Sequence, residues 1–222
     1  MATYIERDVR TISNIGDLAT FQRFVQLCAG RTSQLLNYSA LAADCGVSQP
    51  TAKAWISVLE TSFIVFRLPA FHTNLRTRLV KMPKLHFYDT GLVCWLLGIR
   101  STDQLRTHPL RGAIFETWVV SEILKHRTNR GETAGLSFYR DRDTVETDLI
   151  IEHANHLTLV DARAAQTASA RLFDGARRVR DHLVEPLRPC DVVIAYGGHD
   201  VQIRSNAKLV PWARLHEEKW TR

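Results

Sequence analysis

Three acidic residues in the second half of the chain have the spacing of a metal-binding set. Glu146 and Asp148 are two residues apart in a strand-like run, so their side chains share one face. Twelve residues separate Asp148 from Asp161, which is enough for a hairpin that brings both acids to neighbouring strands. With Glu116 from the preceding helical segment, Asp148 and Asp161 are candidates to hold a divalent metal such as magnesium. The alternative is that these acids are simply solvated on an exposed strand face.

The elements that must position these acids follow from the hydrophobic pattern. A helix, three strands, a basic helix and a further strand are expected in that order, which implies a mixed sheet with helices packed on it. The predicted ranges are 110–125 for the first helix, 136–139, 145–152 and 157–163 for the strands, 169–183 for the basic helix and 191–196 for the last strand.

Two histidines form a second polar group in this half. His153 and His156 stand at a strand end with Glu152 beside them and could form a metal-binding pair. The turn residues Ala154 and Asn155 between them favour a polar hairpin tip instead.

The first half of the chain has the pattern of a helix-turn-helix. An amphipathic helix is expected from Asp17 to Gly30, and a second helix from Tyr38 to Cys45. Gly46 supplies the left-handed conformation of a tight turn, Ser48 caps a third helix, and this helix runs to about Thr61. Its buried stripe is predicted to consist of Ala52, Trp55, Val58 and Leu59.

A wing is expected to follow these helices. Residues 63–68 and 85–88 are β-rich runs, and the segment between them contains basic residues without an acid near its end. The predicted phosphate contacts are Arg76, Arg78, Lys81 and Lys84. On the third helix, Lys53 lies on the exposed face and is added to the nucleic-acid-binding residues, although this face is poorly equipped to read bases.

Composition limits the class of protein. The chain has 222 residues, 45% of them hydrophobic and 23% charged, as is typical of a globular protein with a real core. The net charge of +6 fits an anionic partner such as DNA, and most of it lies in residues 1–100, which carry eleven Lys/Arg against six Asp/Glu. The sequence has no 18-residue apolar run and no signal peptide pattern, so we expect a cytoplasmic protein that does not contact the membrane. The four scattered cysteines predict neither zinc nor disulfides.

Several motifs together resemble a known family. They are Tyr4-Ile5-Glu6-Arg7-Asp8-Val9, Gly46-Val47-Ser48 with Thr51, Lys84-Leu85-His86-Phe87-Tyr88-Asp89-Thr90-Gly91-Leu92, Phe115-Glu116, Phe138-Tyr139-Arg140 and Glu146-Thr147-Asp148-Leu149. In this order they resemble the carboxyl-terminal region of prokaryotic AAA-type ATPases, domain-of-unknown-function family 4143, over Tyr4 to about His182. The resemblance implies a winged helix followed by a domain like the PD-(D/E)XK nucleases.

The resemblance also assigns roles to the acids. Asp148 takes the first metal-binding position, Asp161-Ala162-Arg163 takes the place of the (D/E)-x-K motif, and Glu116 takes that of the helical acid. Arg163 stands where the family has lysine, and arginine does not readily lose a proton to activate water. The catalytic set implied by the resemblance is thus Asp148, Asp161, Arg163 and Glu116, in a degenerate form.

We therefore expect an α/β protein, α+β overall, with a winged-helix domain at 1–100 and a nuclease-like domain at 108–222 joined by the polar stretch 100–109. The expected function is that of a non-catalytic module that binds DNA without sequence preference or docks on an ATPase domain in cis or in trans. The alternatives are a magnesium-dependent DNA nuclease and an interaction scaffold without nucleic acid. The sequence has no G-x-x-x-x-G-K-[ST] loop, so the chain alone is not expected to hydrolyse ATP.

Overall fold

The computed structural model describes residues 17–71, 82–140, 145–168, 170–173, 178–181, 189–204 and 207–221. Its contacts divide the chain into two compact units, which are described separately. The first comprises Met1–Arg67 and Met82–Thr117, and the second Leu68–Lys81 and Trp118–Arg222. The division falls after Thr117, within the helix Arg111–Thr128, whereas the sequence predicts a boundary at the polar stretch 100–109. That polar stretch contains a short helix of its own, Thr102–Thr107.

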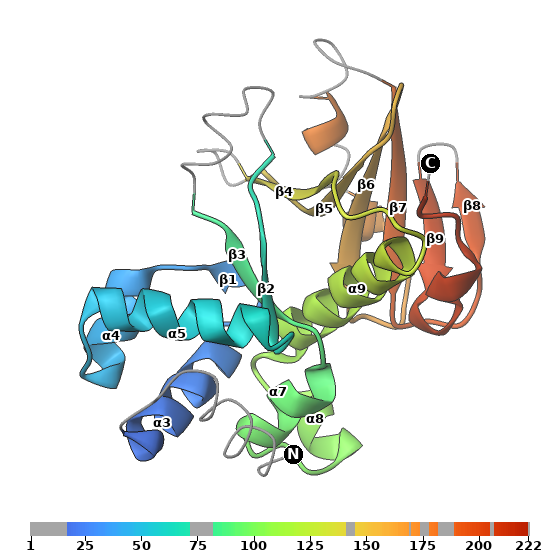
Figure 1. Cartoon of the computed structure of the whole chain (residues 1–222). Helices are drawn as coiled ribbons and strands as arrows, with labels where there is room; N and C mark the ends of the chain where they lie inside the picture. Colours follow the sequence, from blue (N-terminus) through green and yellow to red (C-terminus); the bar gives the residue numbers. More distant parts are fainter. Residues whose placement is uncertain are drawn as a thin grey trace. The chain divides into compact units, whose positions relative to one another are not determined.

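The described part of the first unit begins with three helices, coloured blue to cyan in Figure 1. They are α3 (Leu18–Ala29), α4 (Tyr38–Cys45) and α5 (Gln49–Thr61). Each begins at a side-chain cap, because Asp17, Asn37 and Ser48 accept hydrogen bonds from backbone N–H groups of the first turn. Gly46 ends α4 in the left-handed region at φ 75°, which makes the predicted tight turn to α5 possible.

The core beneath these helices is largely the predicted one. Phe21, Phe24, Val25 and Cys28 of α3 are fully buried. In α5, however, the prediction missed Ile56, which is fully buried, whereas Trp55 and Val58 are only partly covered. The Trp55 ring makes edge contacts with Phe21 and Phe24, at 5.3 and 5.1 Å between ring centroids, and so extends the core toward the surface.

A small sheet completes the first unit, together with shorter helices. Its strands are β1 (Gln34–Leu35), β2 (Val65–Leu68) and β3 (Lys84–Phe87), in the order β1-β3-β2. Helix α7 (Thr90–Leu96) follows, capped by Asp89, and then α8 (Thr102–Thr107). Helix α9 (Arg111–Thr128) carries the chain from the first unit into the second.

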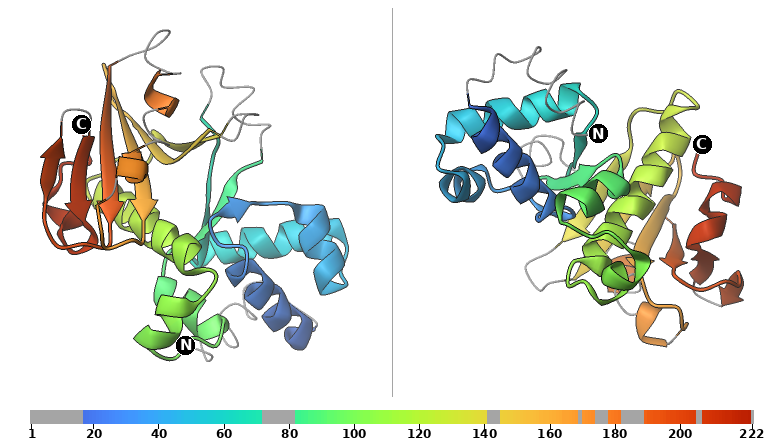
Figure 2. Two further views of the ribbon diagram at one scale, coloured as in Figure 1. Left: turned by 180° about the vertical axis from the view of Figure 1, so that it is seen from behind. Right: turned by 90° about the horizontal axis from the view of Figure 1, so that it is seen from below.

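The second unit is built on a mixed sheet, as predicted, and this sheet has six strands. The strands are β4 (Leu136–Arg140), β5 (Glu146–Glu152), β6 (Leu157–Arg163), β7 (Cys190–Tyr196), β8 (Gln202–Arg204) and β9 (Ala207–Pro211), in the order β4-β5-β6-β7-β9-β8. The neighbours β6 and β7, and also β7 and β9, are parallel, while the other pairs are antiparallel. Figure 2 shows the C-terminal half of α9 along one face of this sheet.

Two 3-10 helices accompany the sheet. They are η2 (Ala170–Phe173) and η3 (Trp212–Glu217). The basic helix predicted at 169–183 is described only in part, since η2 and the helical residues 178–181 are the described segments of this range. Among the described residues, no helix has both the length and the apolar character that a membrane span requires.

Candidate functional site

The structure brings Asp148 and Asp161 together on neighbouring strands. The antiparallel pairing of β5 with β6 includes Leu149 opposite Val160, the residues next to the two acids. Asp161 is fully buried and Asp148 is 7% exposed. The hairpin predicted from the twelve intervening residues is therefore present, but its acids are not on an exposed strand face.

Neutral hydrogen-bond donors hold the two carboxylates. Thr147 donates its hydroxyl to Oδ1 of Asp161 at 2.8 Å, and the backbone N–H of Asp148 approaches the same oxygen at 3.4 Å. The backbone N–H of Ala162 donates to Oδ2 of Asp148 at 2.8 Å. Each acid is thus bound by the backbone of the other strand, which fixes both side chains.

Arg163 spans both acids. Its Nη2 donates to Oδ2 of Asp161 at 3.0 Å, and its Nη1 donates to Oδ2 of Asp148 at 3.3 Å. The guanidinium also donates to the carbonyl of Ala162, and 35% of the Arg163 side chain is exposed. The guanidinium of Arg163, a permanent cation, therefore neutralises part of the charge of a buried pair of acids.

The buried environment changes the titration of Asp161. Burial is the largest cause that raises the pKa of its carboxyl, and the nearby charge of Asp148 raises it further, to about 6. The guanidinium of Arg163 and the hydroxyl of Thr147 act in the opposite direction. Because carboxylates that share a site resist double ionisation, the charge of Asp148 makes Asp161 more readily protonated than an isolated aspartate.

With Arg163 bound across it, the acid pair is not arranged to hold a magnesium ion. Magnesium requires oxygen ligands in octahedral geometry, whereas at least three of the four carboxylate oxygens here accept hydrogen bonds, two of them from the guanidinium of Arg163. Within the described residues, no group of three or more His, Cys, Asp or Glu side chains could hold a metal ion.

Glu116, the predicted helical acid, has a different partner. It belongs to the first unit, where its Oε1 accepts a hydrogen bond from Nζ of Lys84 at 2.9 Å. Both side chains are largely covered, with 14% of Glu116 and 3% of Lys84 exposed. The third member of the predicted metal set is thus engaged in a buried ion pair of its own.

The same ion pair corrects the prediction for Lys84, which was expected to contact phosphate from the wing. Lys84 lies at the start of β3, and a side chain that is 3% exposed cannot reach a nucleic acid. The error arose because basic residues are mostly exposed, and the sequence showed no acid near Lys84. Its partner is 32 residues away.

The remaining predicted phosphate contacts fall into two groups. Arg76, Arg78 and Lys81 lie outside the described residues. Lys53 is exposed on α5, with its ammonium 5.7 Å from the ring centroid of Tyr38. On the same helix, Glu60 pairs with Arg67 at 2.6 Å, so the acid of this face is partly neutralised.

A polar chain missed by the sequence analysis lies beside the Lys84–Glu116 pair. His86 is fully buried, and its Nδ1 lies 3.1 Å from the hydroxyl of Thr117, which in turn lies 2.8 Å from that of Thr32. Burial, with a smaller effect of the Lys84 charge, lowers the pKa of His86 to about 3. The alternation of Lys84 and His86 in a strand was the signal that both point to one face.

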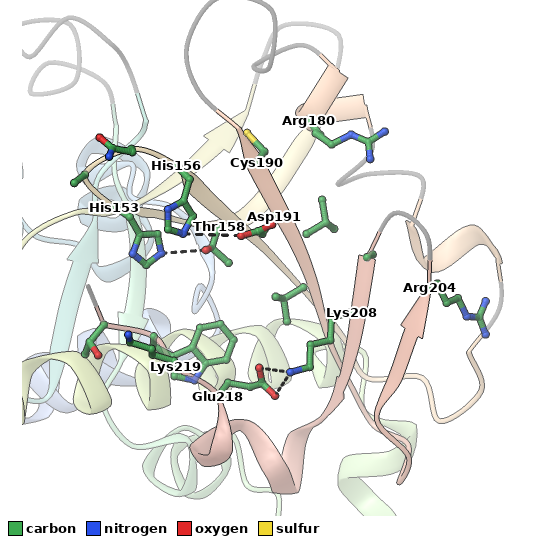
Figure 3. A pocket seen from close by; sticks show the side chains of 17 residues that line it. His153, His156, Thr158, Arg180, Cys190, Asp191, Arg204, Lys208, Glu218 and Lys219 are labelled. Atoms are coloured by element: carbon green, nitrogen blue, oxygen red, sulfur yellow. Dashed lines mark hydrogen bonds and ion pairs between the residues drawn. The ribbon is translucent and has the colours of Figure 1, made fainter.

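The two histidines of the β5–β6 hairpin form its tip. The backbone N–H of His153 donates to the carbonyl of His156, and the rings stack at 4.1 Å between centroids. Nε2 of His153 lies 3.0 Å from the hydroxyl of Thr158, and Nε2 of His156 lies 3.9 Å from Asp191. Figure 3 shows these side chains in a pocket of about 720 Å³. On its other side, Lys208 is neutralised by both oxygens of Glu218.

Comparisons with known proteins divide the chain between residues 103 and 111, close to the boundary predicted at 100–109. Residues 1–103 match the family described as Domain of unknown function (DUF8612), and residues 111–215 match Domain of unknown function (DUF4143). Similar curated proteins are "Uncharacterized protein Mb2031c" of Mycobacterium bovis and "Uncharacterized protein Rv2008c" of Mycobacterium tuberculosis. Each is 26% identical over 95% of this chain. The chain spans about half the length of these relatives, 46% of each.

No solved structure matches the chain. The resemblance drawn from motifs between Tyr4 and His182 is thus supported in part. The family model that matches the second half is the expected one, and the first half matches a separate family model. Over residues 111–215, the chain is similar to domain-of-unknown-function family 4143.

Proposed function

We propose that this chain is a non-catalytic module that binds nucleic acid. It joins a winged helix to a nuclease-like domain whose acidic site no longer supports metal-dependent cleavage. The observation that carries the second part of this proposal is the bridge from Arg163 to both Asp148 and Asp161. A guanidinium stays protonated at any physiological pH, so it supplies positive charge at the acids without the proton transfer that a lysine can perform.

The arrangement of the first unit supports the winged-helix part of the proposal. Three capped helices with a tight turn between α4 and α5 precede a sheet in the order β1-β3-β2, and the neighbouring positions of β2 and β3 are compatible with a wing. The exposed face of α5 carries a single cation, Lys53. We therefore propose contact with phosphates, through Lys53 and the basic segment 76–81, in preference to the reading of bases.

A cleavage assay tests the loss of chemistry. The purified chain should not cleave single- or double-stranded DNA with magnesium or manganese. Arg163→Lys, alone or with Asp161→Glu, should recover a trace of activity, because a lysine frees part of the acid pair and can lose its proton. The control is the same pair of substitutions combined with Asp148→Ala, which should abolish whatever activity is recovered.

The second candidate function is a magnesium-dependent nuclease, and the proximity of Asp148 and Asp161 favours it. Wild-type cleavage that disappears in Asp148→Ala would establish this function and overturn the non-catalytic proposal. Cleavage that persists in Asp148→Ala would indicate a contaminating nuclease or another site in the chain.

Binding is tested by the dependence of duplex affinity on salt. Replacing Arg76, Arg78 and Lys81 by alanine should weaken binding equally for unrelated duplexes and reduce the slope of log K against log salt by about 2–3. The matched control removes three exposed cations of the second unit, Arg178, Arg204 and Lys219, and should change the slope less. Equal slopes for wild type and the first variant would exclude this segment as the contact surface.

Docking on an AAA-type ATPase domain, in cis or in trans, is a further part of the proposal. It rests on the resemblance of the motifs to the carboxyl-terminal region of such ATPases. If the chain shows no salt-dependent affinity for DNA, the alternative of an interaction scaffold without nucleic acid is favoured over the DNA-binding module.

A further inference from the structure

The second unit contains a cleft between α9 and η3 that no predicted role uses. Its volume is about 490 Å³, within the range of small-molecule sites. The side chains that carry the argument are Trp118, His126, Arg130, Trp212, His216 and Trp220. Trp118 and His126 belong to α9, and Arg130 lies in the turn that follows it. Trp212 and His216 belong to η3, and Trp220 lies in the segment after η3.

Aromatic rings form one side of this cleft. Trp212 is 45% exposed, although it packs edge-on against Trp118 at 5.4 Å between ring centroids. Trp220 is buried, and its Nε1 donates to the carbonyl of Leu215 at 2.7 Å. One indole is therefore partly open to solvent, and its position is held by fixed neighbours. Such a surface suits stacking with a planar ring.

Positive charge lies beside these rings. The lining includes Lys125, His126, Arg130 and His216 but a single acid, Glu122, which pairs with Lys125 at 2.6 Å. Arg130 uses Nη1 to donate to the carbonyl of His126 at 3.2 Å. Among the described residues it has no further partner, so its Nε and Nη2 groups are available to an anion.

We propose that this cleft binds one nucleotide unit, with the base stacked on the indole of Trp212 and the phosphate bound by Arg130. An arginine fork matches the geometry of phosphate oxygens, and stacking accepts any base. The proposal is independent of duplex binding through Lys53 and the segment 76–81, because it concerns other residues and a different ligand.

The titration of His126 gives independent support. Burial is the main cause that lowers the pKa of its imidazole, and the charges of Arg130 and Arg127 lower it further. The positive potential that disfavours a second cation at this place favours an anion. A bound phosphate should therefore raise the pKa of His126 toward its ordinary value.

The test is a calorimetric titration of the full chain with adenosine 5′-monophosphate, adenosine and inorganic phosphate. Adenosine 5′-monophosphate should bind more tightly than adenosine or inorganic phosphate alone. Trp212→Ala should weaken it at least about fivefold, the lower end for the loss of a base stack, with Trp212→Phe between wild type and alanine. Arg130→Gln should weaken the monophosphate but leave adenosine unchanged.

Matched controls remove the same groups elsewhere. Trp95→Phe changes an indole of α7 that is 41% exposed, and Arg106→Gln changes an exposed arginine of α8, so neither should alter the affinity. Thermal unfolding of Trp212→Phe and Arg130→Gln checks that the cleft is intact. In NMR titrations, the monophosphate should raise the pKa of His126 in wild type and not in Arg130→Gln.

The nucleotide unit could come from the end of a nucleic-acid strand or from a free nucleotide. A 5′-phosphorylated single-stranded hexanucleotide distinguishes these two sources. If it binds more tightly than the monophosphate and Trp212→Ala removes the advantage, the ligand is the end of a strand. Equal affinity identifies a free nucleotide. No binding of either probe at millimolar concentration, or binding that both Trp212→Ala and Arg130→Gln leave unchanged, would overturn the proposal. Duplex binding through Lys53 and the segment 76–81 can fail or succeed without changing these results.

Discussion

Nη2 of Arg163 lies 3.0 Å from Oδ2 of Asp161, a carboxylate with no exposed surface. A buried acid with one permanent cation beside it depends strongly on that cation, because removal of one partner leaves an uncompensated charge away from water. The guanidinium is itself partly exposed, so water moderates this dependence.

Arg163→Ala should therefore lower the free energy of unfolding by about 2–3 kcal/mol at pH 7. Urea denaturation followed by tryptophan fluorescence measures this loss. Arg178→Ala removes an exposed arginine of the same unit and should change stability by less than about 0.5 kcal/mol. Adding Asp161→Asn to Arg163→Ala should recover part of the loss, since the remaining charge is then removed. An Arg163→Ala variant as stable as wild type would contradict the role assigned to the bridge.

The raised pKa of Asp161 predicts a pH dependence of stability. The folded state binds the proton of Asp161 more tightly than the unfolded state does. The stabilising contribution of this proton to the free energy of unfolding is therefore full below about pH 4 and is lost as pH rises through about 6. Relative to Asp161→Asn, the free energy of unfolding of wild type should fall by on the order of 1–3 kcal/mol between pH 4 and 7. Asp200→Asn, an exposed acid of the same unit, is the control and should give a flat difference. A flat difference for Asp161→Asn itself would show that its pKa is ordinary.

His86 should produce the opposite dependence. Its folded pKa of about 3 lies below the unfolded value of 6.5, so its contribution is full above pH 6.5 and is lost as pH falls. Relative to His86→Gln, the free energy of unfolding of wild type should fall by about 1.4 kcal/mol for each pH unit as pH is lowered from 6.5 to 4.5. The glutamine can still hydrogen-bond to Thr117. Unfolding curves of both proteins across this range measure the effect, and His199→Gln, at an exposed position, should track wild type.

The Lys84–Glu116 pair predicts a loss of stability without a direct loss of DNA contact. Lys84→Met should lower the free energy of unfolding by about 3–5 kcal/mol, because Glu116 then keeps its charge in a mostly buried site. Lys84→Met with Glu116→Leu should restore much of this loss. Lys53→Met, at an exposed position, should leave stability unchanged but weaken duplex binding. If the stable double variant bound DNA as weakly as Lys53→Met, Lys84 would be a phosphate contact after all.

The sequence determined the local elements of this protein. The left-handed glycine at position 46 and the cap at Ser48 were both predicted, since capping and turn geometry depend on neighbouring residues. The strand 157–163 was predicted with its observed bounds. The hairpin that brings Asp148 and Asp161 to neighbouring strands was predicted from the number of residues between them. Local periodicity was sufficient for these features.

Only the tertiary structure decided which side chains meet. Lys84 pairs with a residue 32 positions away, and Thr32 meets Thr117 across 85 positions. The placement of β9 between β7 and β8 likewise has no local signal. These contacts depend on how distant segments pack, and burial then changes the chemistry. A lysine that looked like a phosphate contact became an internal partner, and two acids that looked solvated became a buried pair held by Arg163.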